Sequence, residues 1–352
     1  TMLRNMAIAT SILPDGLDQE VLDSLADEFR QGFAELEESV DRQLYGKRFV
    51  FSRYGKELYP CFEEADATLV PGCIIPIKEG RPVASVDSTC VLVGEASEGA
   101  LYAARAAIGI SHSGALRRFF RLGPILVFAS DSGLVGIDSG LSPSDLAFLL
   151  SDHTLAERVI RNSIEKRVIG ALIAGGGDAI VMADGSLKHP MGQFNGQFPK
   201  IVAEGGRGGG ICLVGFSKSS SLIFSEGVVA ALAKSRGAAY HRVAQGGSHN
   251  DGASRKVQTV LAKFSGDGLV FRLDIAAQQG DESLCRVLGA ILWNDAFSSG
   301  YPDSLKVAHH LSIFSKADDQ ALKAFVTKRF KLRQLPTFSL RRIALGSFKG
   351  GS

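Results

Sequence analysis

Apolar residues recur at spacings of three and four positions from Leu17 to Leu44. Asp15 stands where a helix N-cap is expected, and Asp18 and Glu20 place negative charge in the first turn. The period predicts a long amphipathic helix over 17–44. From 46 to 80, aromatic residues, glycines and prolines follow one another without a period, which predicts an irregular connection with short strands.

From residue 83 the pattern changes to short apolar, β-branched runs with closely spaced turn signals, which predicts an antiparallel three-strand meander. A helical period over 142–174 follows, and then strands alternate with helices to residue 328. The predicted strands are 83–94, 101–110, 124–129, 180–187, 211–216, 257–264 and 268–275, and the later helices are 225–235, 281–296 and 304–328. Three strands, a helix and then alternating elements are in the order of an RNase H-like sheet. The predicted fold class is therefore α/β, an RNase H-like mixed sheet flanked by helices.

Composition adds a few limits. The 352 residues are enough for a sizeable core, and the formal charge of +2 means that nucleic-acid binding would depend on local basic patches. The five cysteines form no C-x-x-C pair, which suits a reducing cytoplasm. No apolar run approaches the roughly 18 residues of a membrane span. We expect a cytoplasmic protein with no membrane partner.

Two apolar strands each carry one aspartate near their end: Val86-Asp87-Ser88 and Ala183-Asp184-Gly185. One such aspartate is more often a turn former or a cap. The RNase H-like order, however, places these two strands side by side, and paired carboxylates on neighbouring strands are typical of a divalent-metal site for phosphate chemistry. The sequence thus predicts a metal site at Asp87 and Asp184.

A third ligand is expected from the helix between the two strands. Glu165 borders the apolar face of that helix and could reach inward, whereas Glu157 resembles a solvated acid of the first turn. Glu165 is the predicted ligand, with Glu157 as the alternative.

Two further candidates are basic. Lys218 follows a buried strand among hydroxyl residues and could hold a phosphate or neutralise developing charge, although a lysine is usually a plain surface cation. His309 and His310 lie on a helix after Gly300-Tyr301-Pro302, where a histidine is more often a partly buried polar residue than a ligand. Neither glycine cluster has the order of a phosphate loop, and there is no zincin, hydrolase-elbow or dinucleotide motif.

Taken together, the motifs resemble the signature of the NurA nuclease family over about residues 80–315. The most specific are Ala183-Asp184-Gly185-Ser186-Leu187, Gly215-x-Ser217-Lys218-Ser219-Ser220 and Tyr301-Pro302-x-x-Leu305-x-x-Ala308-His309. The chain departs from the family at Ser88, where a glycine is usual, and the adjacent carboxylate is retained.

The resemblance implies a DNA nuclease that depends on Mn²⁺ or Mg²⁺, with two ions, and that acts on DNA ends as a homodimer partnered with a HerA-type hexameric ATPase. It makes Asp87, Glu165, Asp184 and His309 the metal ligands. From its place after a buried strand, Lys218 is expected to be a further catalytic residue. The resemblance divides the chain into 1–80, a nuclease domain over 81–330, and a tail over 331–352. Cleavage polarity, exonuclease or endonuclease action, strand preference, and a role in repair or in antiviral defence stay open.

Two other functions remain as alternatives. An ATPase or phosphotransferase of the actin-like superfamily could use Asp87-Ser88-Thr89 to hold phosphates, but that architecture needs two such domains. A DNA-end adaptor without turnover would need no intact set of acids. The apolar stripe of the 17–44 helix and the basic and apolar tail predict contacts within a dimer or with a partner.

Overall fold

The computed structural model describes residues 71–130, 132–135, 150–175, 178–187, 212–217, 231–243, 257–266, 269–276 and 281–335. It also describes residues 45–46, 48–51, 63–64 and 222–223 and the single positions 24, 27, 40 and 42. Those four single positions are helical, as the predicted 17–44 helix requires, and 231–234 are helical within the predicted 225–235 helix. Lys218 and the tail beyond 335 lie outside the described residues.

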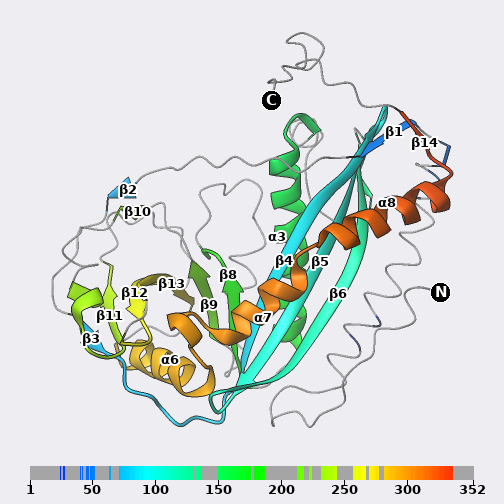
Figure 1. The fold of residues 1–352 in the computed structure, drawn as a ribbon. Coiled ribbons are helices and arrows are strands. Elements are labelled where there is room, and N and C mark those ends of the chain that lie inside the picture. Colours follow the sequence, from blue (N-terminus) through cyan, green and yellow to red (C-terminus); the bar gives the residue numbers. More distant parts are fainter. Residues whose placement is uncertain are drawn as a thin grey trace, which may run out of the picture.

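The centre of the fold is a five-strand sheet in the order β6-β5-β4-β8-β9 (Figure 1). Strands β4 (Val83–Ala96), β5 (Gly99–His112) and β6 (Ala115–Ser130) form an antiparallel meander. After helix α3 (His153–Ala174), strand β8 (Ile180–Asp184) pairs parallel to β4, and β9 (Cys212–Ser217) pairs parallel to β8. This order confirms the predicted RNase H-like fold class.

Further strands extend both ends of the sheet. Beyond β9 lie β13 (Phe271–Ala276), β12 (Gln258–Lys263), β11 (Ala239–Arg242) and β3 (Gly72–Cys73), all in antiparallel pairs. Strand β7 (Gly133–Val135) pairs with the end of β6, while β1 (Arg48–Phe51) joins the far end of β4 to β14 (Arg333–Gln334). A separate pair joins β2 (Glu63–Glu64) to β10 (Leu222–Ile223).

Helices cover both faces of the sheet (Figure 1). The apolar side of α3 packs on one face, against Ala84 and Val86 of β4. Helices α6 (Asp281–Asn294), α7 (Asp303–Ser312) and α8 (Lys316–Phe330) lie on the other, with a short 3₁₀ turn, η3 (Ser298–Gly300), before α7. Because successive strand residues point to opposite faces, β4 contributes side chains to the contacts with α3 on one face and with the other helices on the opposite face. None of the helices described is long and apolar enough to cross a membrane.

Several predicted boundaries are wrong. The single helix expected over 304–328 is two helices, because Ser315 caps α8 in a capping box with Asp318. α3 begins at His153, with Asp152 as its N-cap; residues 150 and 151 are also helical, and the predicted start near 142 lies outside the described residues. β6 starts at Ala115, well before the predicted 124. A register shift opposite Ala104–Ala106 lets β6 continue through Pro124, which has no N–H to donate to the sheet.

Candidate metal centre

Asp87 and Asp184 occupy equivalent places on neighbouring strands. The parallel ladder between β4 and β8 ends at the pair Val86–Ala183, so the two aspartates are the next residue on each strand. β8 ends there, and Gly185 takes a φ of 113° as the chain turns away. β4, in contrast, continues to Ala96 on its pairing with β5. Asp87 is therefore in the middle of a strand and not at a strand end, as the sequence had suggested.

A row of polar side chains fixes α7 on the same face of β4. The hydroxyl groups of Ser85 and Ser304 lie 2.5 Å apart, and those of Thr89 and Ser312 lie 3.1 Å apart. Beneath the start of α7, Gly109 on β5 leaves no room for a side chain, because a Cβ there would meet the backbone of Ser304. The helix can approach the sheet closely only because of this glycine.

His309 projects from α7 to Asp87. Its Nδ1 donates to Asp87 Oδ2 at 2.7 Å, and the Ser312 hydroxyl donates to the same oxygen at 3.3 Å. With Nδ1–H engaged in this way, Nε2 is the ring nitrogen that carries the lone pair. Asp87 is buried, whereas the His309 side chain is 41% exposed. One member of the cluster is thus enclosed, and another is open to solvent.

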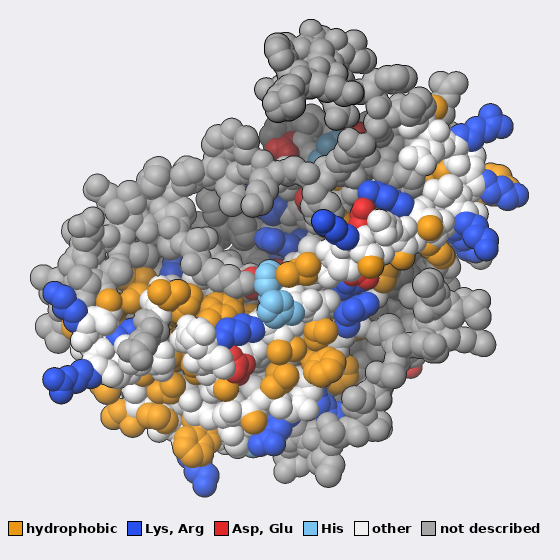
Figure 2. Space-filling view, viewed as in Figure 1, with side chains coloured by type: hydrophobic (Ala, Val, Ile, Leu, Met, Phe, Trp, Pro, Cys, Tyr) orange, Lys and Arg blue, Asp and Glu red, His pale blue; other side chains and the backbone are white. Residues whose placement is uncertain are grey.

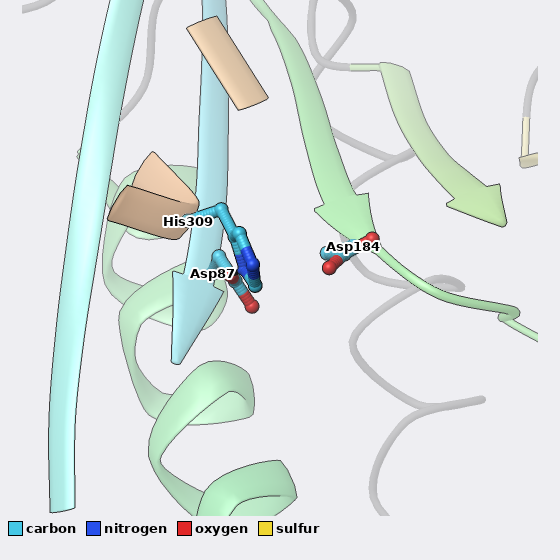
Figure 3. A group of neighbouring side chains, drawn as sticks. All are labelled: Asp87, Asp184 and His309. Carbon is cyan, nitrogen blue, oxygen red and sulfur yellow. Dashed lines mark hydrogen bonds and ion pairs between the residues drawn. The ribbon is translucent and has the colours of Figure 1, made fainter. Parts of the chain in front are cut away.

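Asp87, Asp184 and His309 each offer a ligand atom within 4.8 Å of the other two. In Figure 3 the three side chains converge from β4, the end of β8 and α7 on one space. Two ligands of one ion with bonds of about 2.1 Å lie at most about 4.2 Å apart, so only a small closure is needed. Two hard carboxylates and one imidazole fit Mn²⁺ or Mg²⁺.

Asp184 is held through the turn that follows it. Gly185 N–H donates to the Phe216 carbonyl (2.9 Å), and Leu187 N–H donates to the Asp274 carboxylate (3.1 Å), as does the Ser186 hydroxyl. Asp274 is fully buried on β13 and belongs to no motif that the sequence analysis found. The only signal in the sequence is the alternation of Arg272 and Asp274 with apolar residues, which indicates a two-faced strand and no function.

Tyr301 supports the other side of Asp184. Its hydroxyl donates to Asp184 Oδ1 over a long 3.4 Å, and its ring packs edge-on against Phe216, with centroids 5.3 Å apart. Burial, followed by the charges of Asp184 and Asp87, raises the pKa of Tyr301 well above its usual value. The phenol therefore stays protonated as a donor. Tyr301 belongs to one of the sequence motifs, but no role was predicted for it.

Glu165 reaches the cluster from the opposite face of the sheet. It lies on α3, is 9% exposed, and accepts a hydrogen bond from the Ser88 hydroxyl at 2.8 Å. Burial raises its pKa to about 8, and the charges of Asp87 and Asp184 add to the rise against the opposing effect of Arg161. The structure places Glu165 beside the cluster but outside the three-residue group. Ser88, which stands in place of the expected turn glycine, is a strand residue that holds this carboxyl.

Glu157 binds the backbone of β4 and lies outside the three-residue group. Its Oε1 accepts the Leu92 N–H at 2.8 Å, next to the register shift between Leu92 and Gly94, and burial raises its pKa. The expectation of a solvated first-turn acid is wrong, because this carboxyl satisfies a backbone donor of β4. Of the other candidates, His310 is exposed beside His309, and Lys218 lies outside the described residues.

No family model and no curated protein matches this chain. Among solved structures, the chain is similar to NurA nucleases. The NurA nuclease from Sulfolobus solfataricus matches at 15% identity, over 90% of this chain and 98% of that one, with a TM-score of 0.46. A NurA structure with manganese matches at 8% identity over 73% and 91%, with a TM-score of 0.45. A NurA structure bound to dAMP and manganese matches at 10% identity over 93% and 98%, with a TM-score of 0.39.

Proposed function

We propose that this protein is a metal-dependent deoxyribonuclease. The observation that carries the proposal is the convergence of Asp87, Asp184 and His309, which come from three separate elements, within 4.8 Å. Burial raises the pKa of the neighbouring Glu165 carboxyl, and the charges of Asp87 and Asp184 add to the rise. Three acidic groups thus concentrate in one region, where a cation would balance their negative charge. A site built only for folding would gain nothing from this concentration.

The position of each residue gives it a separate role in metal binding, in support of the ligands or in substrate contact. Asp87, Asp184 and His309 would hold a divalent ion, and Glu165 would join them, or bind a second ion, once deprotonated. Bound ions of this kind lower the pKa of water and stabilise the charge on a scissile phosphate. Tyr301 would orient Asp184 by its hydrogen bond, and Asp274 would hold the turn behind it. Lys218 would contact the substrate phosphate from the segment after β9.

The finer assignment rests on the motif resemblance. On that basis we propose Mn²⁺ or Mg²⁺ as the ion, DNA ends as the substrate, a homodimer as the active form and a HerA-type ATPase as the partner. The role would be end resection in repair or defence against foreign DNA. The domain division at residues 80 and 330 belongs to the same proposal.

End-labelled linear DNA tests the activity directly. The full-length protein is incubated with single- and double-stranded substrates in Mn²⁺, Mg²⁺ or chelator, with and without a HerA-type ATPase. We expect cleavage that requires the metal. Nucleotide hydrolysis without DNA cleavage would favour the actin-like alternative, and DNA binding without cleavage would favour the adaptor.

Asp87→Asn and Asp184→Asn test the site. Each variant keeps the shape of the side chain but removes the charge that holds a hard cation, so we expect a loss of cleavage of at least about 100-fold. Asp178→Asn is the matched control, because Asp178 is an exposed aspartate paired with Arg81 just before β8. Near-normal cleavage by either site variant would contradict the assignment.

A further inference from the structure

The first half of β6 carries the sequence Arg117-Arg118-Phe119-Phe120-Arg121, and no acidic residue occurs anywhere in this 16-residue strand. Arg117, Phe119 and Arg121 are all exposed. We name these three residues the β6 strip. Figure 2 shows hydrophobic side chains between Lys and Arg side chains on this face of the molecule, beside α7.

Two residues of the strip, Phe119 and Arg121, lie on the same face of the sheet as the metal centre, and Arg117 is the extra residue at the register shift opposite Ile110 and Ser111. Asp87 pairs with Ala107 on β5, and Ala107 pairs with Arg121 on β6, so Asp87 and Arg121 share one row and one face. Two strand spacings separate them, about 10 Å. Phe119 pairs with Gly109, the residue on which α7 rests. The strip therefore runs along the side of α7 away from the carboxylates.

Among the described residues, the acid whose charge acts on Arg121 is shared with another arginine. This acid, Asp318, is engaged by the buried Arg105, whose Nη2 lies 3.1 Å from Asp318 Oδ1. Partial burial and then the charge of Arg105 lower the pKa of Arg121. Arg117 stands at the other end of the strip and donates through Nε to the His112 carbonyl. Two arginines thus present positive charge on either side of Phe119.

Protection of an exposed strand edge against pairing explains the arginines of the strip, but it does not explain Phe119. In the described part of the chain, β7 pairs with β6 only from Phe128 onward, and arginines on such an open edge would discourage pairing with another chain. A phenylalanine that is 55% exposed has the opposite effect. An aromatic ring between two cations is, however, the usual arrangement for stacking a base while the neighbouring phosphates are neutralised.

We propose that the β6 strip binds single-stranded nucleic acid, with a base stacked on Phe119 and phosphates at Arg117 and Arg121. The strip would hold the strand on the side of α7 opposite the metal centre. This role rests on the proposed function, but the binding itself does not require cleavage.

Fluorescence anisotropy with a labelled 20-nucleotide oligothymidine, in chelator and at several salt concentrations, measures the binding without turnover. Phe119→Ala should weaken binding about 5- to 100-fold without changing the salt dependence, and Phe119→Trp should retain it. The double variant Arg117→Gln/Arg121→Gln should weaken binding and reduce the slope of log K against log salt by about 1.4, because each lost phosphate contact on a single strand contributes about 0.7.

Matched controls are Phe325→Ala and the double variant Arg329→Gln/Arg333→Gln, which remove an exposed aromatic and two exposed arginines at α8 and β14. If the strip variants bind oligothymidine no more weakly than these controls, the proposal is wrong. If they bind it normally but lose self-association in light scattering, the strip is an interface between copies and the proposal is equally wrong.

Hydrolysis of thymidine 5′-(p-nitrophenyl phosphate) with Mn²⁺ separates the two proposals, because this diester has one nucleoside and no further strand that could pass α7 and occupy the strip. The strip variants should hydrolyse it at the parent rate. If the parent hydrolyses it while the strip variants bind oligothymidine normally, only the strip fails. If the parent binds oligothymidine through the strip but hydrolyses neither the small diester nor end-labelled DNA, only the nuclease function fails.

Discussion

At the scale of single residues, the candidate site brings the buried carboxyl groups of Asp87 and Glu165 close to that of Asp184. Asp87 is buried with His309 as its partner, and Glu165 is buried with a serine hydroxyl as its partner. Residues arranged in this way oppose folding to some degree and are explained by what they bind. The effect of Glu165 on the stability of the metal-free protein can be measured.

Glu165→Gln should stabilise the metal-free protein at high pH. An unfolded glutamate ionises near 4.5, whereas burial raises the folded pKa to about 8, so the folded state holds the extra proton between these values. Stability therefore falls as pH rises from about 4.5 to 8, by an amount on the order of a few kcal/mol, and the glutamine variant escapes this loss. Thermal unfolding in chelator at pH 5 and pH 9 should show equal stability at the lower pH and a more stable variant at the higher.

With Mn²⁺ bound, the parent should be more stable than the Glu165→Gln variant at high pH. The ion requires the deprotonated carboxylate, so its stabilisation of the parent should grow with pH, while the glutamine variant should gain less. Equal shifts with Mn²⁺ in both proteins would remove Glu165 from the metal site and leave Asp87, Asp184 and His309.

At the scale of elements, the site depends on how α7 and α8 are seated on the sheet. α7 brings His309 to Asp87 through its hydroxyl contacts with β4, and α8 is tied to β5 by the ion pair of Asp318 with Arg105. These are contacts between residues about 200 positions apart in the chain. Two substitutions distant from the ligands test them.

Gly109→Ala should impair cleavage without touching a ligand. The added methyl group would overlap the backbone at Ser304, so α7 must shift or the overlap must cost about 1–3 kcal/mol of stability. We expect both a lower melting temperature and weaker Mn²⁺ binding, measured by titration calorimetry. Gly237→Ala is the matched control, since a Cβ there meets nothing within 4 Å. Unchanged Mn²⁺ binding by Gly109→Ala would mean that the position of α7 does not set the site.

Asp318→Asn should destabilise the protein in a manner that depends on pH. The hydrogen bonds from Arg105 hold the pKa of Asp318 well below its usual range. The stability this provides is present above about pH 4, the ordinary pKa of an aspartate, and is lost as pH falls through the folded pKa. We expect a cost of about 1–3 kcal/mol at pH 7 in urea unfolding. A cost that persists undiminished at pH 2 would show that the charge of Asp318 is not its source.

At the scale of the whole molecule, the strands β1 and β14 join distant parts of the chain at one end of β4. β1 pairs antiparallel with β4 and parallel with β14, so the first and the last described strands meet there. The tail that follows β14 mixes basic and apolar residues from 336 to 348. An apolar segment of this kind must pack on its own domain, across a dimer or on a partner.

We predict a homodimer to which the 17–44 helix and the tail contribute. Light scattering should give twice the chain mass for the full-length protein. A variant that ends at Leu335 keeps β14, and we expect it to dimerise more weakly and to bind a HerA-type hexamer less well. A monomeric full-length protein would refute the dimer, and an unchanged complex would refute the role of the tail.

Local patterns in the sequence were enough to predict the order of the elements and to name candidate site residues. Periods of two and of three to four residues depend on neighbours in the chain, so they revealed the strands of the meander, α3, β8 and β9 in the right order. The same local reading named Asp87, Asp184 and Glu165 as candidate ligands, and the motif resemblance added His309. Even the break between α7 and α8 had a local signal in Ser315 and Asp318.

How these residues come together depends on the folded arrangement of the sheet and helices. The register of β8 against β4 puts Asp184 beside Asp87, the seat of α7 on Gly109 brings in His309, and Ser88 holds Glu165 on the opposite face. Glu157 was misread because its partner, the Leu92 N–H, belongs to another element. Asp274 had no functional signal, because its partners other than Arg272 are 15 to 88 positions away in the chain. Contacts of this range are fixed by pairing and packing across the whole sheet, and a local pattern does not encode them.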